Sequence, residues 1–215
     1  MLNWGSGGGK SLSGTRRESA PARWDWRLRR WRRKWALAWG LIALVLMLTP
    51  PVMGQPELAD LLRALNLSDY PPGMWPPPFK GQTVTGQAVS LADFQGRVVL
   101  VNFWATWCAE CRAEMPLFER LHQDFAAQGL TVLGVNFRED TQHIQGYIKK
   151  HGLTFPMVLD PGGEIFRSYG VVGLPTTFLV GRDGRPMALA VGVRAWESAE
   201  TRALIQALLA ESVAN

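Results

Sequence analysis

The chain has 215 residues, of which 47% are hydrophobic, and this suits one globular domain of ordinary size with an appended segment. Its net charge of +5 is carried by the amino-terminal end. Residues 1–34 hold ten Lys or Arg and two acids, whereas the remaining residues hold thirteen Lys or Arg and sixteen acids. The globular part is therefore mildly acidic. It is not expected to bind nucleic acid, which requires a clustered basic surface.

The amino-terminal region has the pattern of a targeting segment. A basic tail over residues 1–34 is followed by the uncharged apolar run Trp35–Leu48. That run is shorter than the roughly 20 residues of a membrane-spanning helix, and its extension to Gly54 contains two prolines. Two alternatives follow: a single-pass signal-anchor over residues 35–54 in the inner (cytoplasmic) membrane, or a signal peptide cleaved near Gly54. Both place the later residues outside the cytoplasm, because Lys and Arg stay inside, so the domain is expected to be periplasmic or secreted.

Residues 55–79 are predicted to connect this region to the domain. Leucines at positions 58, 61, 62 and 65 have the spacing of a short amphipathic helix, which would lie on the membrane or pack on the domain. The five prolines that follow Tyr70 then predict a stiff extended linker. The domain itself is predicted to cover residues 80–215.

From residue 80 onwards, predicted strands and helices alternate. A hairpin is expected around Gly86, and an Asp183–Gly184 turn should join the last two strands. Continuous apolar runs predict two strands that are buried on both faces, and a short strand and four helices complete the pattern. The two buried strands are expected over residues 97–103 and 130–137, the short strand over 155–160, and the helices over 109–127, 141–151, 163–170 and 196–212. This order indicates an α/β fold with a mixed central sheet flanked by helices.

Two cysteines, Cys108 and Cys111, are separated by two residues. A structural zinc site needs four ligands, and the histidines of the chain have no ligand spacing. Covalent haem attachment needs a histidine directly after the second cysteine, where this chain has Arg112. A structural disulfide gains little from so short a loop. A reacting dithiol is therefore favoured, with no metal and no cofactor beyond a redox-active disulfide between the two cysteines.

The surroundings of the cysteines predict their roles. Cys108 follows a buried strand and precedes a helix, whose free N–H groups stabilise a thiolate, so Cys108 is expected to be the nucleophile and Cys111 the resolving cysteine. Glu114 lies three residues further on, on the helix face of Cys111. It is either an exposed residue paired with Arg112 or Arg120, or an inward one. An inward carboxylate would tune the pKa of Cys111 and accept its proton.

Several motifs resemble the thioredoxin superfamily over residues 80–212, and in particular the exported TlpA/ResA/CcmG-type redoxins. They are "VSLADFQGRVVLVNFWATWCAEC", "RAEMP", "VNFRED", "FPMVLD", "YGVVGLPTTFLV" and "RDGRP". The resemblance implies a thioredoxin fold with an added amino-terminal β-hairpin. It also implies a cis-proline at Pro175 that faces the dithiol. Residues beside the cysteines and this proline are then expected to contact the substrate, namely Trp107, Ala109, Glu110, Leu174 and Thr176.

Two departures from cytosolic thioredoxins refine the resemblance. Thioredoxins carry a buried Asp in the strand before the motif, where this chain has Asn102, and they tend to have Gly-Pro between the cysteines, where it has Ala109-Glu110. The TlpA/ResA-like branch instead has a Glu at the position of Glu114. In effect, the acid has moved from the strand to the helix.

The resemblance implies an extracytoplasmic thiol-disulfide oxidoreductase that reduces disulfides of exported proteins, with apocytochrome c in cytochrome c biogenesis as a client by family analogy. Electrons are expected from a membrane thiol-reductant donor, because the chain has no flavin or nucleotide motif. One alternative is a net disulfide oxidase or isomerase, since the same residues serve both directions and the reduction potential decides. A non-catalytic, tethered redoxin-fold binding module is another. A thiol peroxidase is less favoured, because Cys108 lacks the upstream Pro and Thr/Ser of peroxiredoxins.

Overall fold

The computed structural model describes residues 57–70 and 77–211. The predicted basic tail (1–34), the signal-anchor or signal peptide (35–54) and most of the proline-rich linker lie outside these residues. Within the described ranges, no helix is both long and apolar enough to cross a membrane.

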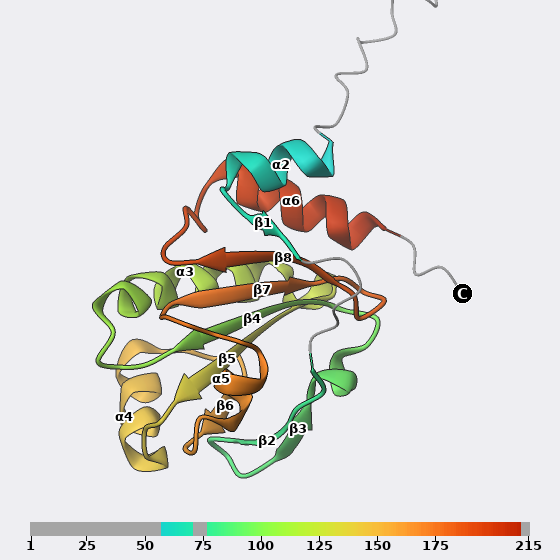
Figure 1. The fold of residues 1–215 in the computed structure, drawn as a ribbon. Helices are drawn as coiled ribbons and strands as arrows, with labels where there is room; N and C mark the ends of the chain where they lie inside the picture. Colours follow the sequence, from blue (N-terminus) through green and yellow to red (C-terminus); the bar gives the residue numbers. More distant parts are fainter. Residues whose placement is uncertain (1–56, 71–76, 212–215) are drawn as a thin grey trace, which may run out of the picture. The chain divides into compact units, whose positions relative to one another are not determined.

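The domain is built on one mixed sheet of eight strands in the order β1-β8-β7-β4-β5-β6-β2-β3 (Figure 1). The central strands β4, β5 and β6 run parallel, while β7 is antiparallel to β4 and β2 is antiparallel to β6. The strands are β1 (Ser68–Asp69), β2 (Lys80–Thr83), β3 (Ala88–Ser90), β4 (Val98–Trp104), β5 (Leu130–Phe137), β6 (Met157–Asp160), β7 (Thr176–Val180) and β8 (Pro186–Val191).

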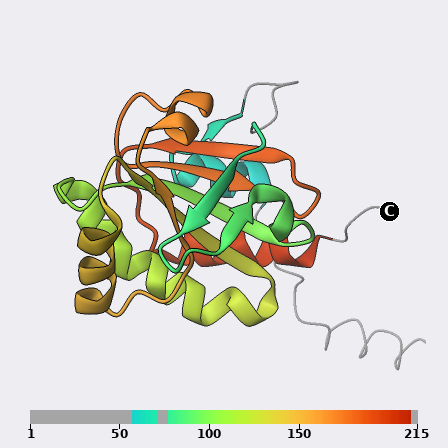
Figure 2. The same ribbon diagram turned by 90° about the horizontal axis from the view of Figure 1, so that it is seen from below.

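Helices cover both faces of the sheet, as predicted. Figure 2 shows α3 and α6 on one side and α5 on the other. Phe118 of α3 and Leu204 of α6 belong to the core on the first face, whereas Ile165 of α5 packs with Phe103 and Phe178 on the second. The helices are α2 (Leu58–Ala64), α3 (Ala109–Phe125), α4 (Thr141–His151), α5 (Glu164–Ser168) and α6 (Ala199–Ala210), with 3-10 turns η1 (Leu91–Phe94) and η2 (Ala126–Gln128).

The two central strands are buried along their length. All seven residues of β4 are buried, and so are the first seven residues of β5. Burial on both faces explains their continuous apolar sequences, which distinguish them from the half-exposed β8. The predicted strands over residues 97–103 and 130–137 are therefore confirmed.

Both predicted hairpins are present in the sheet. β2 pairs with β3, and Gly86 in their turn has a φ of 83°. β7 pairs with β8, and Gly184 in that turn has a φ of 80°. A side chain at either glycine would be strained in this left-handed conformation, which is why "TG" and "DG" predicted the turns correctly.

The short helix before the linker packs on the domain. Leu61 of α2 and its C-cap Leu65 are each 5% exposed and belong to the same core as residues of α6, which lies beside α2 in Figure 1. After α2, Ser68 and Asp69 form β1, which pairs with Leu189 and Ala188 at the edge of the sheet. These elements precede residue 80, where the domain was predicted to start, so the folded unit includes residues on both sides of the proline-rich stretch.

Candidate functional site

The two cysteines lie at the start of α3, just after the end of β4. Cys108 is the N-cap of α3, and the backbone N–H of Cys111 donates a hydrogen bond to the Sγ of Cys108 over 3.1 Å. The two residues are joined by a disulfide, with Cys108 6% exposed and Cys111 fully buried. Cys108 is thus the more accessible of the two cysteines to a second molecule. On reduction, its thiolate would face the N–H groups and positive end of the helix, which stabilise negative charge.

Glu114 of α3 is buried, with 1% of its surface exposed. Its Oε1 accepts hydrogen bonds from the indole N–H of Trp196 at 2.6 Å and from the backbone N–H of Arg194 at 3.0 Å. Its Oε2 has no partner within the part of the chain that the structure describes. Of the two placements left open by the sequence, the inward one is observed, and Arg112 instead donates to the carbonyl of Thr106.

Burial raises the pKa of Glu114 to about 7, although the hydrogen bonds from Arg194 and Trp196 oppose the shift. A pKa near neutrality is typical of a group that accepts and donates a proton at neutral pH. It lies one helical turn beyond Cys111, on the same face of α3.

Asn102 occupies the strand position where thioredoxins have an acid. It is fully buried in β4, and its Nδ2 donates to Thr177 Oγ1 on β7 over 3.0 Å. A neutral amide at this position adds no charge beneath the dithiol. Glu114 therefore supplies a buried carboxyl group from the helix side of the motif.

The loop before β7 brings Pro175 to the end of the sheet at which β4 leads into the cysteine motif. The Leu174–Pro175 peptide bond is cis, and the carbonyl of Pro175 accepts a hydrogen bond from the N–H of Gly192 at 2.8 Å. Thr176, the next residue, lies opposite Phe103, which is near the end of β4. Because β4 leads directly into the cysteine motif, the proline loop and the dithiol share one end of the sheet.

The predicted substrate-contact residues differ in their exposure. Trp107 is 62% exposed, and Ala109 and Glu110 are also exposed, so all three are accessible beside Cys108. Leu174 is half-buried. Thr176 is 2% exposed and its hydroxyl donates to the carbonyl of Gly173, so it holds the proline loop.

A polar cluster next to Cys108 was missed by sequence reasoning. Glu139 accepts hydrogen bonds from the backbone N–H and hydroxyl of Thr106 and from Nδ2 of Asn136. His143 Nε2 lies 2.8 Å from the Thr106 hydroxyl. We call these four residues the Thr106 cluster. Asn136 lies near the end of β5 and Glu139 follows that strand. The parallel pairing of β4 and β5 was the signal that would have placed both residues beside the loop after β4.

The Thr106 cluster fixes the backbone two residues before Cys108. We expect Glu139→Ala to lower the free energy of unfolding by about 2–4 kcal/mol, because the buried N–H and hydroxyl of Thr106 lose their acceptor. Urea denaturation would measure this change. The matched control is Glu164→Ala, which removes an exposed carboxylate paired with Arg167 and should cost below about 1 kcal/mol. Equal losses in the two variants would contradict the assigned role.

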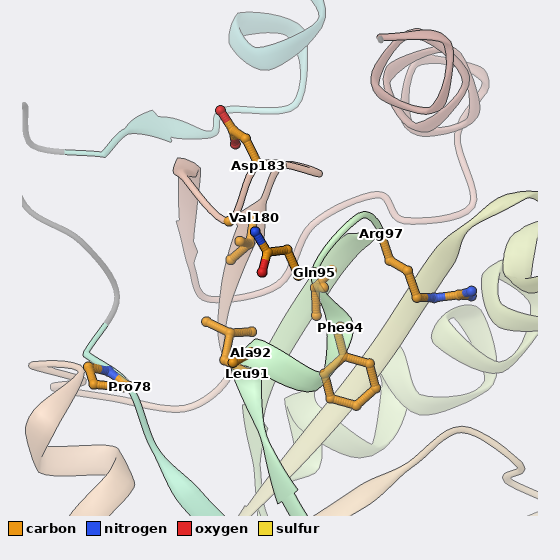
Figure 3. A pocket seen from close by; sticks show the side chains of 11 residues that line it. Pro78, Leu91, Ala92, Phe94, Gln95, Arg97, Val180 and Asp183 are labelled. Carbon is orange, nitrogen blue, oxygen red and sulfur yellow. The ribbon is translucent and has the colours of Figure 1, made fainter. Parts of the chain in front are cut away.

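A hollow at the far end of β4 does not belong to this site (Figure 3). It is lined by Leu91 and Phe94 of η1, Arg97 before β4 and Val180 at the end of β7. The Arg97 side chain extends away from the other labelled side chains in Figure 3, and its guanidinium donates to Thr131 Oγ1 and to two backbone carbonyls. The guanidinium of Arg97 is thus already hydrogen-bonded within the protein.

Comparisons with known proteins agree with this geometry. Residues 73–185 match the AhpC/TSA family. The thiol-disulfide oxidoreductase ResA of Bacillus thuringiensis subsp. konkukian is 37% identical over 109 residues, covering 51% of this chain. The match spans 63% of the length of that relative.

Two solved structures share the fold. One is a thiol:disulfide interchange protein of the thioredoxin family from Chlorobium tepidum, which is 29% identical with a TM-score of 0.58 over 66% of this chain and 99% of that one. The other is a secreted thiol-disulfide isomerase from Corynebacterium glutamicum, which is 26% identical with a TM-score of 0.59 over 75% and 96%. The thioredoxin-like fold predicted from the sequence motifs is thus confirmed.

Proposed function

Because the chain belongs to the AhpC/TSA family, we propose that it is a thiol-disulfide oxidoreductase whose Cys108–Cys111 pair reduces disulfides in other proteins. The observation that carries the proposal is the dithiol pair at the start of α3, next to a buried carboxyl group with a pKa of about 7. Redox exchange needs one accessible sulfur, a second sulfur within bonding distance and a group that moves a proton. We assign the accessible sulfur to Cys108, the second sulfur to Cys111 and the movement of the proton to Glu114.

In the proposed reaction the Cys108 thiolate attacks one sulfur of a client disulfide. The client S–S bond breaks, a Cys108–client mixed disulfide forms, and the other client sulfur leaves as a thiolate that takes up a proton. Cys111 then loses its proton to Glu114 and attacks the Sγ of Cys108. The second client sulfur leaves and is protonated, so two electrons and two protons have passed to the client and the Cys108–Cys111 disulfide is restored.

Net direction depends on the reduction potential, and oxidation or isomerisation of clients is the second candidate function. It is favoured by the likeness to the secreted isomerase from Corynebacterium glutamicum. The two candidates are separated by equilibrating the protein with glutathione mixtures of known potential and measuring the oxidised fraction. We expect a reduction potential more negative than that of protein disulfide isomerase, which is roughly −180 mV. A reduction potential near that of DsbA, roughly −120 mV, would favour the oxidase.

The proposed clients are exported proteins with disulfides, including apocytochrome c before haem attachment, and the proposed electron source is a membrane thiol-reductant donor. The basic tail and the apolar run of residues 35–54 support an extracytoplasmic domain that is held by the inner membrane or released by cleavage. Protease added to intact spheroplasts should digest the domain if it faces outward. Complete protection would contradict the proposed location.

The activity itself is tested by the reduction of insulin with dithiothreitol as electron donor. We expect turnover above the rate of dithiothreitol alone, with loss of that excess in Cys108→Ser. Absence of turnover in the unaltered chain would favour the alternative of a tethered binding module with a redoxin fold.

A further inference from the structure

Hydrogen bonds connect the segment before the proline-rich linker with the buried carboxyl group of Glu114. The residue that makes this connection is Arg194, in the loop between β8 and α6. Its Nε donates to the carbonyl of Asn66 over 3.1 Å, while its backbone N–H donates to Oε1 of Glu114 over 3.0 Å. Asn66 lies in the turn between α2 and β1. One residue therefore contacts both the amino-terminal part of the domain and the proposed proton acceptor.

Residues 58–70, which we call the α2–β1 segment, are held on the domain at both ends. Leu61 and Leu65 pack in the core beside α6, and β1 pairs with β8 at the edge of the sheet (Figure 1). Asn66, between the two elements, has a φ of 51°. Asn enters this left-handed conformation more readily than most residues, so it suits the turn. The carbonyl that Arg194 contacts is therefore held in a defined place.

The loop that carries Arg194 is also anchored by Trp196. This residue is buried, its ring centroid lies 5.2 Å from that of Phe118 in α3, and its indole N–H donates to Glu114. Arg194 is only half-buried, and its guanidinium also donates to two backbone carbonyls of its own loop. The side chain of Arg194 thus joins this part of the loop to the α2–β1 segment. In doing so it holds in place the N–H that Glu114 accepts.

Arg194 also acts on Glu114 through its charge. Burial raises the pKa of Glu114 to about 7, and the backbone N–H of Arg194, the indole of Trp196 and the guanidinium charge of Arg194 each oppose the rise. Among the described residues, Arg194 is the charged side chain whose field acts on this carboxyl group, and Cys111 is the thiol one helical turn away on the same face of α3. Removal of the guanidinium would withdraw the charge and loosen the loop. Both changes favour the protonated form of Glu114.

We propose that Arg194 is a positioning residue for Glu114, and that through Arg194 the docked α2–β1 segment controls the rate at which Cys111 resolves the mixed disulfide. The inference rests on the proposed function and adds a controlling element to the same site. Release of the α2–β1 segment from the sheet would remove an acceptor of the Arg194 side chain and free the loop. Glu114 would then be ionised less often, so resolution would slow while the first attack by Cys108 would not.

The test uses the full chain, reduced with dithiothreitol and desalted, and an equimolar amount of the aromatic disulfide dithiobis(nitrobenzoate). Attack by Cys108 breaks the S–S bond of the reagent, forms a mixed disulfide and releases one coloured thiolate. Cys111 then passes its proton to Glu114 and attacks the Sγ of Cys108, which releases the second coloured thiolate. Absorbance therefore reports attack and resolution as two phases. The rate of the second phase is measured from about pH 6 to about pH 9, which gives the inflection expected for Glu114.

Arg194→Met keeps an unbranched apolar stem but removes the charge and the side-chain donors. We expect the inflection of the second phase to move up by about one pH unit, and the rate at about pH 7 to fall about fivefold, because a smaller share of Glu114 is ionised. The first phase should stay within about twofold, since Cys108 retains the N–H groups at the start of α3. An inflection that stays in place would overturn the proposal.

Leu65→Ala tests the α2–β1 segment without a change at Arg194. It removes a core side chain next to Asn66 and should move the inflection in the same direction, whereas the double variant with Arg194→Met should show no shift beyond that of Arg194→Met alone. The matched control is Leu153→Ala, because Leu153 follows α4 and is likewise 5% exposed in the same core. Urea denaturation establishes that both variants are folded. Equal shifts in Leu65→Ala and Leu153→Ala would mean general destabilisation and would overturn the proposal.

Failure of the two proposals gives different results. If the unaltered, reduced chain releases no coloured thiolate in either phase, the proposed function is wrong. If both phases appear and neither Arg194→Met nor Leu65→Ala moves the inflection, the inference about Arg194 alone is wrong. If Arg194→Met moves the inflection and Leu65→Ala does not, Arg194 acts by its charge without the α2–β1 segment, which also overturns the proposal.

Discussion

Cys111→Ser is expected to convert the protein into a trap for its clients. The variant retains Cys108 at the start of α3, where the helix N–H groups stabilise its thiolate, so the first attack still occurs. Without the second sulfur, the mixed disulfide has no internal route to resolution. Turnover with insulin should fall to the rate of dithiothreitol alone, and a covalent complex should appear on non-reducing gels.

The reciprocal variant is the control for this assignment. Cys108→Ser leaves the fully buried Cys111 as the remaining thiol and should form no complex, because a client disulfide cannot reach it. If Cys108→Ser accumulated complexes and Cys111→Ser did not, the roles of nucleophile and resolving cysteine would have to be exchanged.

Glu114→Gln is expected to slow the resolution of that mixed disulfide. The amide keeps the shape of the side chain but cannot accept the proton of Cys111, and a positioned general base contributes typically about 10²–10⁴-fold. We therefore expect the resolution rate at pH 7 to fall about 100-fold. In the unaltered protein the rate should rise through an inflection near pH 7, because the pKa of Glu114 is about 7, and the variant should lack this inflection.

The same substitution is expected to change how stability depends on pH. Burial raises the pKa of Glu114 from 4.5 to about 7, so between these values the folded state binds more protons than the unfolded state. The contribution of Glu114 to stability is then fully present below pH 4.5 and is lost as the pH rises to about 7, with a slope of at most about 1.4 kcal/mol per pH unit. Glu114→Gln should remove this slope, as measured by urea denaturation of the oxidised protein across the range.

Glu110→Gln is the matched control for both measurements. Glu110 lies in the first turn of the same helix but is exposed to solvent. Its replacement should leave both the inflection near pH 7 and the stability slope in place. If it removed them as well, they would report the overall charge near the dithiol and would not belong to Glu114.

Helix starts and turns were predictable because their causes are local. Gly152 follows α4 with a φ of 64°, and Asp140 caps the start of that helix by accepting from the N–H of His143. Such effects involve residues within one turn of each other, so the sequence pattern contains them. The same holds for the cysteine motif, whose chemistry follows from ligand counts and spacing.

The environment of Glu114 could not be predicted from the local sequence pattern. The periodicity of α3 places Glu114 on the face of Cys111 but leaves both an exposed and a buried position open. Trp196, whose indole N–H it accepts, is 82 residues away in the sequence. The loop that carries Trp196 is also joined to the chain before the linker, because Arg194 Nε donates to the carbonyl of Asn66.

The sequence by itself predicted the order of the strands and helices from residue 80 onwards and a redox-active Cys108–Cys111 pair, since both predictions depend on neighbours along the chain. Only the tertiary structure decided which carboxyl groups lie near the dithiol and which side chains they contact. Glu114 meets Trp196, Glu139 meets Thr106, and Tyr70 meets Phe178 across gaps of many residues. These contacts exist because the fold brings distant segments together, and hydrogen bonds and burial depend on separation in space.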